Sequence, residues 1–250
     1  MAYNYPDLSY DDMHTAYKEA EKNSNKIRKI TANYFNVSET SLRYRDYVNY
    51  CINKKNVDFV PYQFTGDAAK IFAGSLMIGN NSTIIGFNST MNDGRCHFTQ
   101  LHEINHLFND VKEGATGESF PDLLQAEGYN PEEQYREAVA NFGASMLLIP
   151  EEPMYKCILE GHDLEQGFSR EFESSYSANF TRLRDYLIYI CGATAYGAWS
   201  AIEEYKALYS NSRLYKHFQN NYEKYPYVKK AIDSVTLSNG AFADFAGIIW

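Results

Sequence analysis

The sequence predicts an α+β protein in which a short antiparallel sheet and a histidine-bearing helix are flanked by helical regions on both sides. Three observations predict this class. Apolar residues recur at helical spacing near both ends of the chain. Short apolar runs separated by Asn and Gly lie between these regions, and two strongly helical segments follow the runs. With 44% hydrophobic and 22% charged residues, the 250-residue chain is neither a disordered tail, a collagen-like fibre nor a coiled coil.

Residues 1–54 are expected to form a helical N-terminal region. Apolar residues follow helical spacing over 11–53, and the intervening sequence NVSETS predicts a turn with Ser38 as a helix N-cap. The segment 24–48 is therefore one candidate for a helix-turn-helix-like unit that contacts DNA. A solvated basic helix face is the alternative interpretation of its charge. The basic residues in question are Lys26, Arg28, Lys29, Arg43 and Arg45.

The chain as a whole is acidic, with 23 Lys and Arg against 32 Asp and Glu and a net charge of −9. This balance argues against a protein that coats nucleic acid by charge alone. The acidic excess lies in residues 56–155, which hold 4 basic and 14 acidic side chains. We therefore expect the chemistry of the protein to lie in this part of the chain.

Residues 55–155 carry the predicted sheet and two helices. Two of the strands flank Gly79-Asn80-Asn81, a sequence typical of a hairpin turn. Residues 109–130 hold three glycines and one proline and predict a loop or lid. The expected strands are 57–62, 74–78 and 82–87, and the expected helices run from 92 to 108 and from 131 to 150.

Residues 156–250 are expected to form a helical C-terminal region. The segment 168–190 within it is a second helix-turn-helix candidate, because Phe172–Arg182 aligns without gaps on Phe35–Arg45. Common use of serine caps explains the same similarity, so both interpretations stay open.

A membrane span and secretion are not expected. Tyr186–Ile202 is 17 residues long without a charge, but it is short for a span and diluted by small and polar residues, so we expect a buried helix. The N-terminus lacks the basic and apolar stretches of a signal peptide. Four widely spaced cysteines form no CxxC pair. A cytoplasmic protein with reduced thiols is expected.

The segment FTQLHEINHLF carries the most informative pattern. His102 and His106 are four residues apart, so both imidazoles leave the same face of a helix and can chelate one divalent ion. Glu103 lies beside the first histidine, where its carboxylate can accept a proton from a water molecule. The alternative is a pair of structural histidines beside an ordinary acid.

A catalytic zinc site needs a third protein ligand and an open position for water. His97 is five residues before His102 and faces another side of the helix. The next helix offers three glutamates, of which Glu133 and Glu137 share a face with Asn141. A solvated acidic face is the other interpretation, especially for Glu132 and Glu133.

HEINH, followed some thirty residues later by EQYREAVANFGASMLLIP, resembles the ImmA/IrrE family of zinc metallopeptidases, and IIGFNS and RCHFTQL fit as well. The resemblance covers about residues 55–152. It implies a small zincin-like, minimal gluzincin-like domain. It also implies that one Zn²⁺ per chain is bound by His102, His106 and Glu137, with Glu103 as general base.

Asn141 and Glu133 are candidates for orienting these ligands; for Asn141, helix packing is an equal alternative. Asn105 departs from the glycine usual in the family.

The resemblance further implies a role. Members of the family cleave cytosolic helix-turn-helix repressors in bacteria, phages and mobile elements. We therefore expect residues 1–54 and 156–250 to flank a zinc metallopeptidase domain at 55–155, whose partner is a protein substrate. Nucleic acid has little support as a partner. The alternative is a non-catalytic zincin-fold regulator that binds a repressor or DNA, which the intact Glu103 disfavours.

Overall fold

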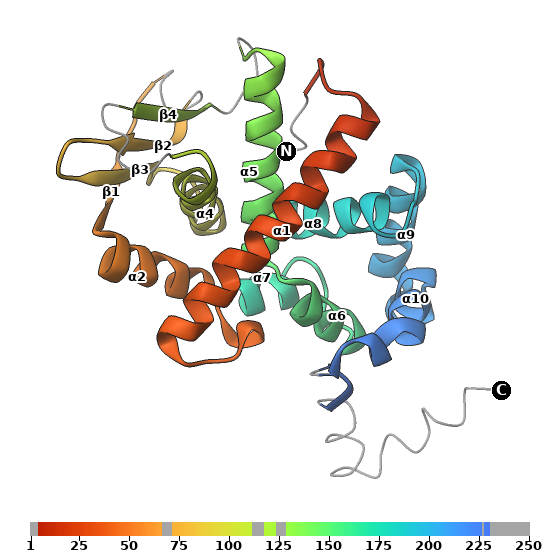
Figure 1. The fold of residues 1–250 in the computed structure, drawn as a ribbon. Helices are drawn as coiled ribbons and strands as arrows, with labels where there is room; N and C mark the ends of the chain where they lie inside the picture. Colours follow the sequence, from red (N-terminus) through yellow and green to blue (C-terminus); the bar gives the residue numbers. More distant parts are fainter. Residues whose placement is uncertain (1–4, 67–71, 112–117, 124–128, 227, 231–250) are drawn as a thin grey trace.

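The computed structural model describes residues 5–66, 72–111, 118–123, 129–226 and 228–230. A four-stranded sheet lies at one side of the molecule, and helix α4 (Asp93–Asn109) packs directly against it. Helix α5 (Pro131–Leu148) and the long helix α1 (Tyr10–Phe35) form the next layer, and the C-terminal helices lie beyond them (Figure 1). The histidine-bearing helix therefore lies between the sheet and other helices.

The N-terminal region is helical, as predicted. A capping box formed by Ser9 and Asp12 starts α1, which ends where Asn36 adopts a left-handed conformation (φ 54°). Ser38 caps a short 3₁₀ turn, and α2 (Tyr44–Lys55) begins only after Arg43. Ser38 is therefore a cap, as predicted, but it caps the connection between α1 and α2 rather than the start of α2.

The predicted hairpin is confirmed, whereas the sheet is mixed rather than wholly antiparallel. Its strand order is β1-β3-β2-β4, and Ile78 faces Thr83 across the hairpin of β2 and β3. Strand β1 pairs with β3 in parallel, so β3 lies between β1 and β2 in the sheet. The strands are β1 (Val57–Tyr62), β2 (Phe72–Ile78), β3 (Thr83–Asn88) and β4 (Glu118–Leu123).

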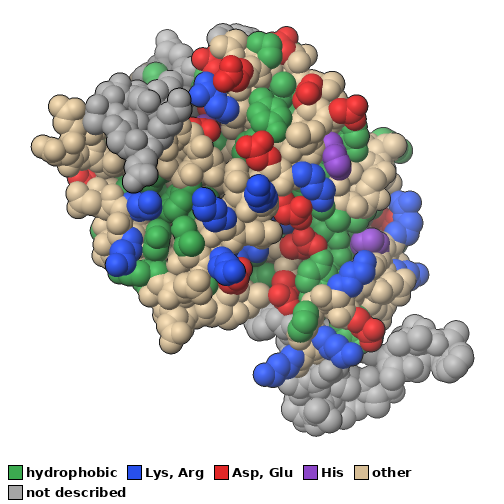
Figure 2. All heavy atoms as spheres, in the orientation of Figure 1, with side chains coloured by type: hydrophobic (Ala, Val, Ile, Leu, Met, Phe, Trp, Pro, Cys, Tyr) green, Lys and Arg blue, Asp and Glu red, His purple; other side chains and the backbone are tan. Residues whose placement is uncertain are grey.

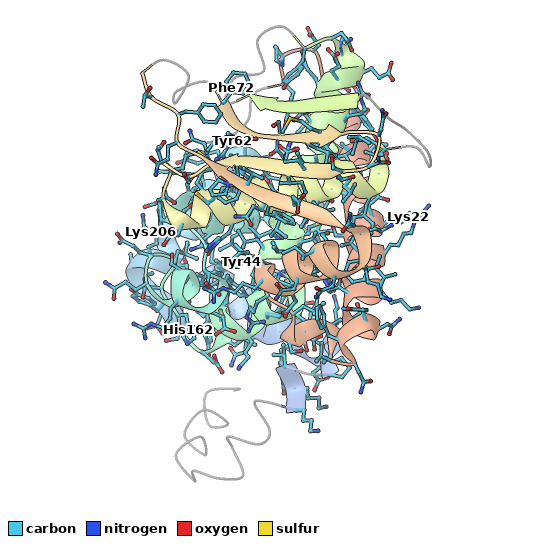
Figure 3. The ribbon with its side chains drawn as sticks, turned by 90° about the vertical axis from the view of Figure 1, so that its left-hand side faces the viewer. Lys22, Tyr44, Tyr62, Phe72, His162 and Lys206 are labelled. Carbon is cyan, nitrogen blue, oxygen red and sulfur yellow. The ribbon has the colours of Figure 1, made fainter. Side chains whose placement is uncertain are left out.

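Strand β4 lies within the segment that the sequence predicted as a loop. It pairs antiparallel with β2 at the edge of the sheet, and edge strands are where proline is tolerated. On the outer face of the sheet, Tyr62 lies across Gly86 of β3 (Figure 3). The mixed sheet and its covering helices confirm the predicted α+β class.

Helices α4 and α5 begin and end close to the predicted positions. Asn92 caps α4 by accepting a hydrogen bond from the Arg95 amide, and Asn130 and Glu133 form a capping box at the start of α5. The two helices and the sheet pack together through fully buried residues. These core residues include Leu76, Ile85, Leu101, Ile104, Ala144 and Leu147.

The C-terminal region is helical in its described part, as predicted. Tyr186–Ile202 is not one helix, however, because the chain turns at Gly192 (φ 70°) between α8 and α9. Among the described residues, no helix is both long and apolar enough to cross a bilayer. The helices are α6 (Glu151–Leu159), α7 (Gly167–Phe172), α8 (Tyr176–Tyr189), α9 (Ala195–Leu208) and α10 (Arg213–Asn221), with 3₁₀ turns at Tyr209–Asn211 and Tyr222–Lys224.

Helix α8, the second helix of one helix-turn-helix candidate, is an interior element. The Arg182 guanidinium is buried and donates hydrogen bonds to the Ile149 carbonyl oxygen and the Tyr17 hydroxyl, and Leu183 is also buried. Arg182 therefore joins α8 to α1 and to the end of α5. A helix that reads DNA must present such side chains to the groove, so this packing does not favour α8 in that role.

The N-terminal candidate presents a basic surface. Lys and Arg side chains gather over α1 and α2 on the face seen in Figure 2. Two members of the predicted basic cluster are paired internally, Arg43 with Glu171 and Arg45 with Glu173. These ion pairs reduce the charge available to a phosphate backbone, and DNA binding by 24–48 stays a prediction.

Candidate metal centre

Three side chains from two helices form a compact donor cluster. His102 and His106 project from one face of α4 towards α5, and Glu137 projects back from α5. Their imidazole and carboxylate ligand atoms all lie within 4.8 Å of one another. His102 has no exposed surface because the sheet covers one side of α4 and α5 covers another. The predicted ligand set is therefore assembled in a buried position.

The distances within this cluster suit a tetrahedral cation. The two Nε2 atoms are 2.9 Å apart, and the Glu137 carboxylate oxygens lie 3.2 Å from His102 Nε2 and 3.4 Å from His106 Nε2. Tetrahedral ligands with bonds of about 2.1 Å are separated by about 3.4 Å. The two imidazole nitrogens and the Glu137 carboxylate, which turns one oxygen towards each of them, thus suit a divalent transition metal, a kind of ion that can keep a further position for water or substrate.

Burial and hydrogen bonds shift the pKa values of Glu137 and His106 in opposite directions. Burial raises the pKa of Glu137, but hydrogen bonds and charge from His102 and His106 outweigh it and hold the pKa well below its ordinary value. Burial lowers the pKa of His106, whereas hydrogen bonds to Asp110 and Glu137 raise it well above its ordinary value. Glu137 is therefore ionised at neutral pH, which is the form that a metal ligand must have.

Glu103 lies on the sheet side of α4. Its side chain is fully buried, and its carboxylate lies against β2 at Gly74. A Cβ atom at Gly74 would be 3.0 Å from Glu103 Oε1 and 2.5 Å from the Thr99 methyl carbon. The absence of a side chain at Gly74 therefore leaves the room in which the Glu103 carboxylate sits.

Each histidine is held through its other ring nitrogen. His102 Nδ1 lies 3.1 Å from Asn141 Oδ1, and Asn141 Nδ2 donates to the Tyr5 hydroxyl at 2.6 Å. His106 Nδ1 lies 2.5 Å from Asp110 Oδ2. With Nδ1–H donating to these oxygens, Nε2 of both rings is left to face the cluster.

Asn141 was a candidate orienting residue from the sequence, whereas Tyr5 and Asp110 were not predicted. Asp110 follows His106 by four residues, the same helical spacing that identified the histidine pair, so its proximity was predictable. Tyr5 carried no such signal. It reaches α5 because Asp7 and the buried Gln134 exchange two hydrogen bonds, which hold the N-terminal segment against that helix.

The comparison with known families agrees with this geometry. Residues 54–184 match the family model Peptidase_M78, described as the IrrE N-terminal-like domain. The chain belongs to this peptidase family. The match spans both helices of the donor cluster and confirms the resemblance drawn from HEINH and the helix that follows. No curated protein matches the chain.

Two glutamates of the M78 domain lie away from the donor cluster. The Glu133 carboxylate accepts a hydrogen bond from the Asn130 amide at 2.8 Å, as part of the cap of α5. Glu132, in the same turn, is exposed. The structure therefore gives Glu133 a capping role in place of the orienting role considered from the sequence.

His97, the remaining histidine near the motif, also lies away from the donor cluster. The His97 ring stacks on Tyr44 of α2 at a centroid distance of 3.6 Å, and its Nδ1 lies 2.7 Å from the Glu173 carbonyl oxygen. It therefore links α4 to α2 and to the connection before α8. Its position agrees with its exclusion as a ligand on grounds of helical spacing.

Asn105 replaces the family's usual glycine and is accommodated by the facing helix. Its side-chain amide donates to the Leu101 carbonyl oxygen, and the same side chain fills the space beside Gly143 of α5. A Cβ atom at Gly143 would overlap the Asn105 side chain. The small residue on α5 thus lets this M78 domain carry a larger residue within its HEINH motif.

Proposed function

We propose that the protein is a zinc-dependent endopeptidase that hydrolyses a peptide bond in a cytosolic protein, in particular a helix-turn-helix repressor of a mobile element or stress regulon. The observation that carries the catalytic part is the juxtaposition of the His102, His106 and Glu137 ligand atoms with a buried carboxylate, Glu103, on the same helix. Membership of a peptidase family supports the same reaction class.

The donor set favours zinc over the hard cations. His102 and His106 would supply imidazole nitrogens, and Glu137 would supply a carboxylate oxygen, whereas magnesium and calcium prefer all-oxygen sites. The separations of 2.9 to 3.4 Å between the donor atoms agree with the small tetrahedral sphere of zinc. A bound zinc ion supplies Lewis acidity, which acidifies a water molecule and polarises the peptide carbonyl.

The protein's own residues would move the proton and hold the ligands. Glu103, on the residue after the first histidine, would take a proton from the attacking water and deliver it to the leaving amine. Its burial between α4 and β2 excludes bulk water from that transfer. Asn141 and Asp110 would fix the two imidazoles so that their Nε2 atoms stay directed at the cluster.

The repressor substrate is an inference from the family resemblance. It can be tested in cells that express either the wild-type chain or Glu103→Gln, which keeps the size and polarity of the side chain but is no longer a base. New protein N-termini are then compared by mass spectrometry. We expect a new terminus within a helix-turn-helix protein in wild-type cells alone.

Purified protein separates the chemistry from the identity of the substrate. Glu103→Gln should bind zinc as the wild type does and should not cleave the protein found in cells. Cleavage by Glu103→Gln at the wild-type rate would overturn the proposed mechanism. A new terminus in an unrelated protein would overturn the repressor while leaving the peptidase in place.

A further inference from the structure

Residues 5–9 lie outside the part of the chain that matches the M78 family, residues 54–184, yet they pack on helix α5 of that domain. Their backbone is fixed locally, before α1 begins. The Leu8 amide donates to the Tyr5 carbonyl oxygen at 3.1 Å and closes a tight turn with Pro6 at its second position, where proline presets the backbone. The turn therefore fixes the place from which the Tyr5 side chain leaves the backbone.

Polar and apolar contacts dock this N-terminal segment on α5. The Asp7 amide donates to Gln134 Oε1 at 3.2 Å, and Gln134 Nε2 donates to Asp7 Oδ2 at 2.6 Å. Gln134 is buried, so water competes little for these bonds. The Tyr5 ring belongs to an apolar cluster with Ala138 and Phe142 of α5, and only 8% of the residue is exposed. The Tyr5 hydroxyl is thereby held at the surface of α5.

Asn141 connects this contact to the donor cluster. It follows Gln134 by seven residues and Glu137 by four, so its side chain leaves α5 between the direction that holds the segment and the direction of the ligand. Its Nδ2 donates to the Tyr5 hydroxyl at 2.6 Å, and its Oδ1 lies 3.1 Å from His102 Nδ1. When His102 Nδ1 donates to the amide oxygen, the amide nitrogen must find an acceptor on the other side. Tyr5 supplies that acceptor.

We propose that Tyr5 is a positioning residue of the metal centre, a role that rests on the proposed function, in which the donor cluster holds zinc. By holding the Asn141 amide, Tyr5 fixes the orientation of the His102 ring and so raises the zinc affinity of the cluster. Tyr5 acts through Asn141 rather than on the ion. The metal centre therefore depends on a segment that lies outside the residues matching the M78 family.

The test is a double-mutant cycle on the zinc dissociation constant, measured by competition with a chromophoric chelator. Tyr5→Phe keeps the ring in the apolar cluster and removes only the hydroxyl. It should weaken zinc binding about two- to tenfold, the factor for one neutral hydrogen bond. Asn141→Ala should weaken zinc binding by about 10- to 100-fold. In the Asn141→Ala background, Tyr5→Phe should have no further effect, because the connection to His102 is already broken.

Tyr135→Phe is the matched control. Tyr135 also lies between α5 and the N-terminal part of the chain, but its hydroxyl donates to Glu19 of α1, at 2.8 Å and at an exposed position. This variant should bind zinc as the wild type does. Equal zinc affinity in the wild type and Tyr5→Phe, an equal loss in Tyr5→Phe and Tyr135→Phe, or an undiminished effect of Tyr5→Phe in the Asn141→Ala background would overturn the role of Tyr5 alone. Failure of zinc to bind the wild type would overturn the proposed function and this role with it.

Linkage supplies a second measurement, which a purely structural role of Tyr5 would not affect. If docking of residues 5–9 strengthens zinc binding, zinc must strengthen the docking by the same factor. The Asp7 amide is bonded to Gln134, so its hydrogen exchange reports on undocking of the segment. We expect zinc to slow this exchange about two- to tenfold in the wild type and to leave it unchanged in Asn141→Ala. An exchange rate that zinc does not alter in the wild type would overturn the coupling between Tyr5 and the metal centre.

Discussion

Replacing Asp110 by Ala removes the carboxylate that holds His106 from outside the donor cluster. The hydrogen bond is 2.5 Å long, and the side chains of His106 and Asp110 are only 3% and 17% exposed, so solvent screens the pair little. Loss of such a partner typically weakens metal binding by about 10- to 100-fold, or about 1.4 to 2.7 kcal/mol. Asp110→Asn keeps an acceptor oxygen without the charge, and charge-assisted bonds are about twice as strong as neutral ones. It should therefore lose about half of that free energy.

The assay is competition for zinc against a chromophoric chelator, with wild type, Asp110→Asn and Asp110→Ala measured side by side. Glu132→Ala serves as the control, because Glu132 is an exposed acid outside the donor cluster. The expected order of affinity is wild type and control, then Asp110→Asn, then Asp110→Ala. Equal zinc affinity in the wild type and Asp110→Ala would refute the reasoning that this carboxylate positions His106.

Three further predictions concern a glycine beside the centre, a buried arginine and two cysteines. Gly74→Ala should lower kcat/KM by about tenfold to a hundredfold with zinc content unchanged, since the new Cβ forces a shift of about 1 Å near Glu103. A wild-type kcat/KM on the substrate protein identified in cells would contradict this prediction. Arg182→Met should lower the free energy of unfolding by on the order of 3 kcal/mol, because it leaves two buried acceptors without their donor. Urea denaturation measures this loss, and a midpoint equal to that of the wild type would contradict the buried position. At pH 8, iodoacetamide should modify Cys191 faster than Cys51. Burial raises the pKa of both thiols, but Cys191 is exposed to the reagent, whereas Cys51 is buried and its pKa is raised to about 12. Peptide mass spectrometry distinguishes the two, and equal rates of modification would contradict the prediction.

The elements that the sequence predicted best are those with local signals. Helix α4 begins at Asn92 because its side chain caps the first turn, and α5 begins at a proline after another Asn cap. The hairpin turn between β2 and β3 is equally local. The two histidines and Glu137 were predictable because helical spacing and the family resemblance place them on facing helices.

The features that the sequence did not predict depend on contacts between distant segments. Strand β4 exists because β2 offers an unpaired edge, a property of the assembled sheet rather than of residues 118–123. Tyr5 reaches Asn141 only because Asp7 and Gln134, 127 positions apart, hold the N-terminal segment on α5. Glu133 satisfied the spacing expected of a residue near the ligands, but local capping of α5 determines its position.

In the proposed function, His102, His106 and Glu137 together hold one zinc ion. The most direct test is the metal content of the purified chain by mass spectrometry, with wild type beside Glu137→Ala. We expect close to one zinc per wild-type chain and a clear loss in the variant, because two imidazoles alone form an incomplete site. An absence of metal from the wild type even after zinc is added back, or an undiminished zinc content in Glu137→Ala, would contradict the account.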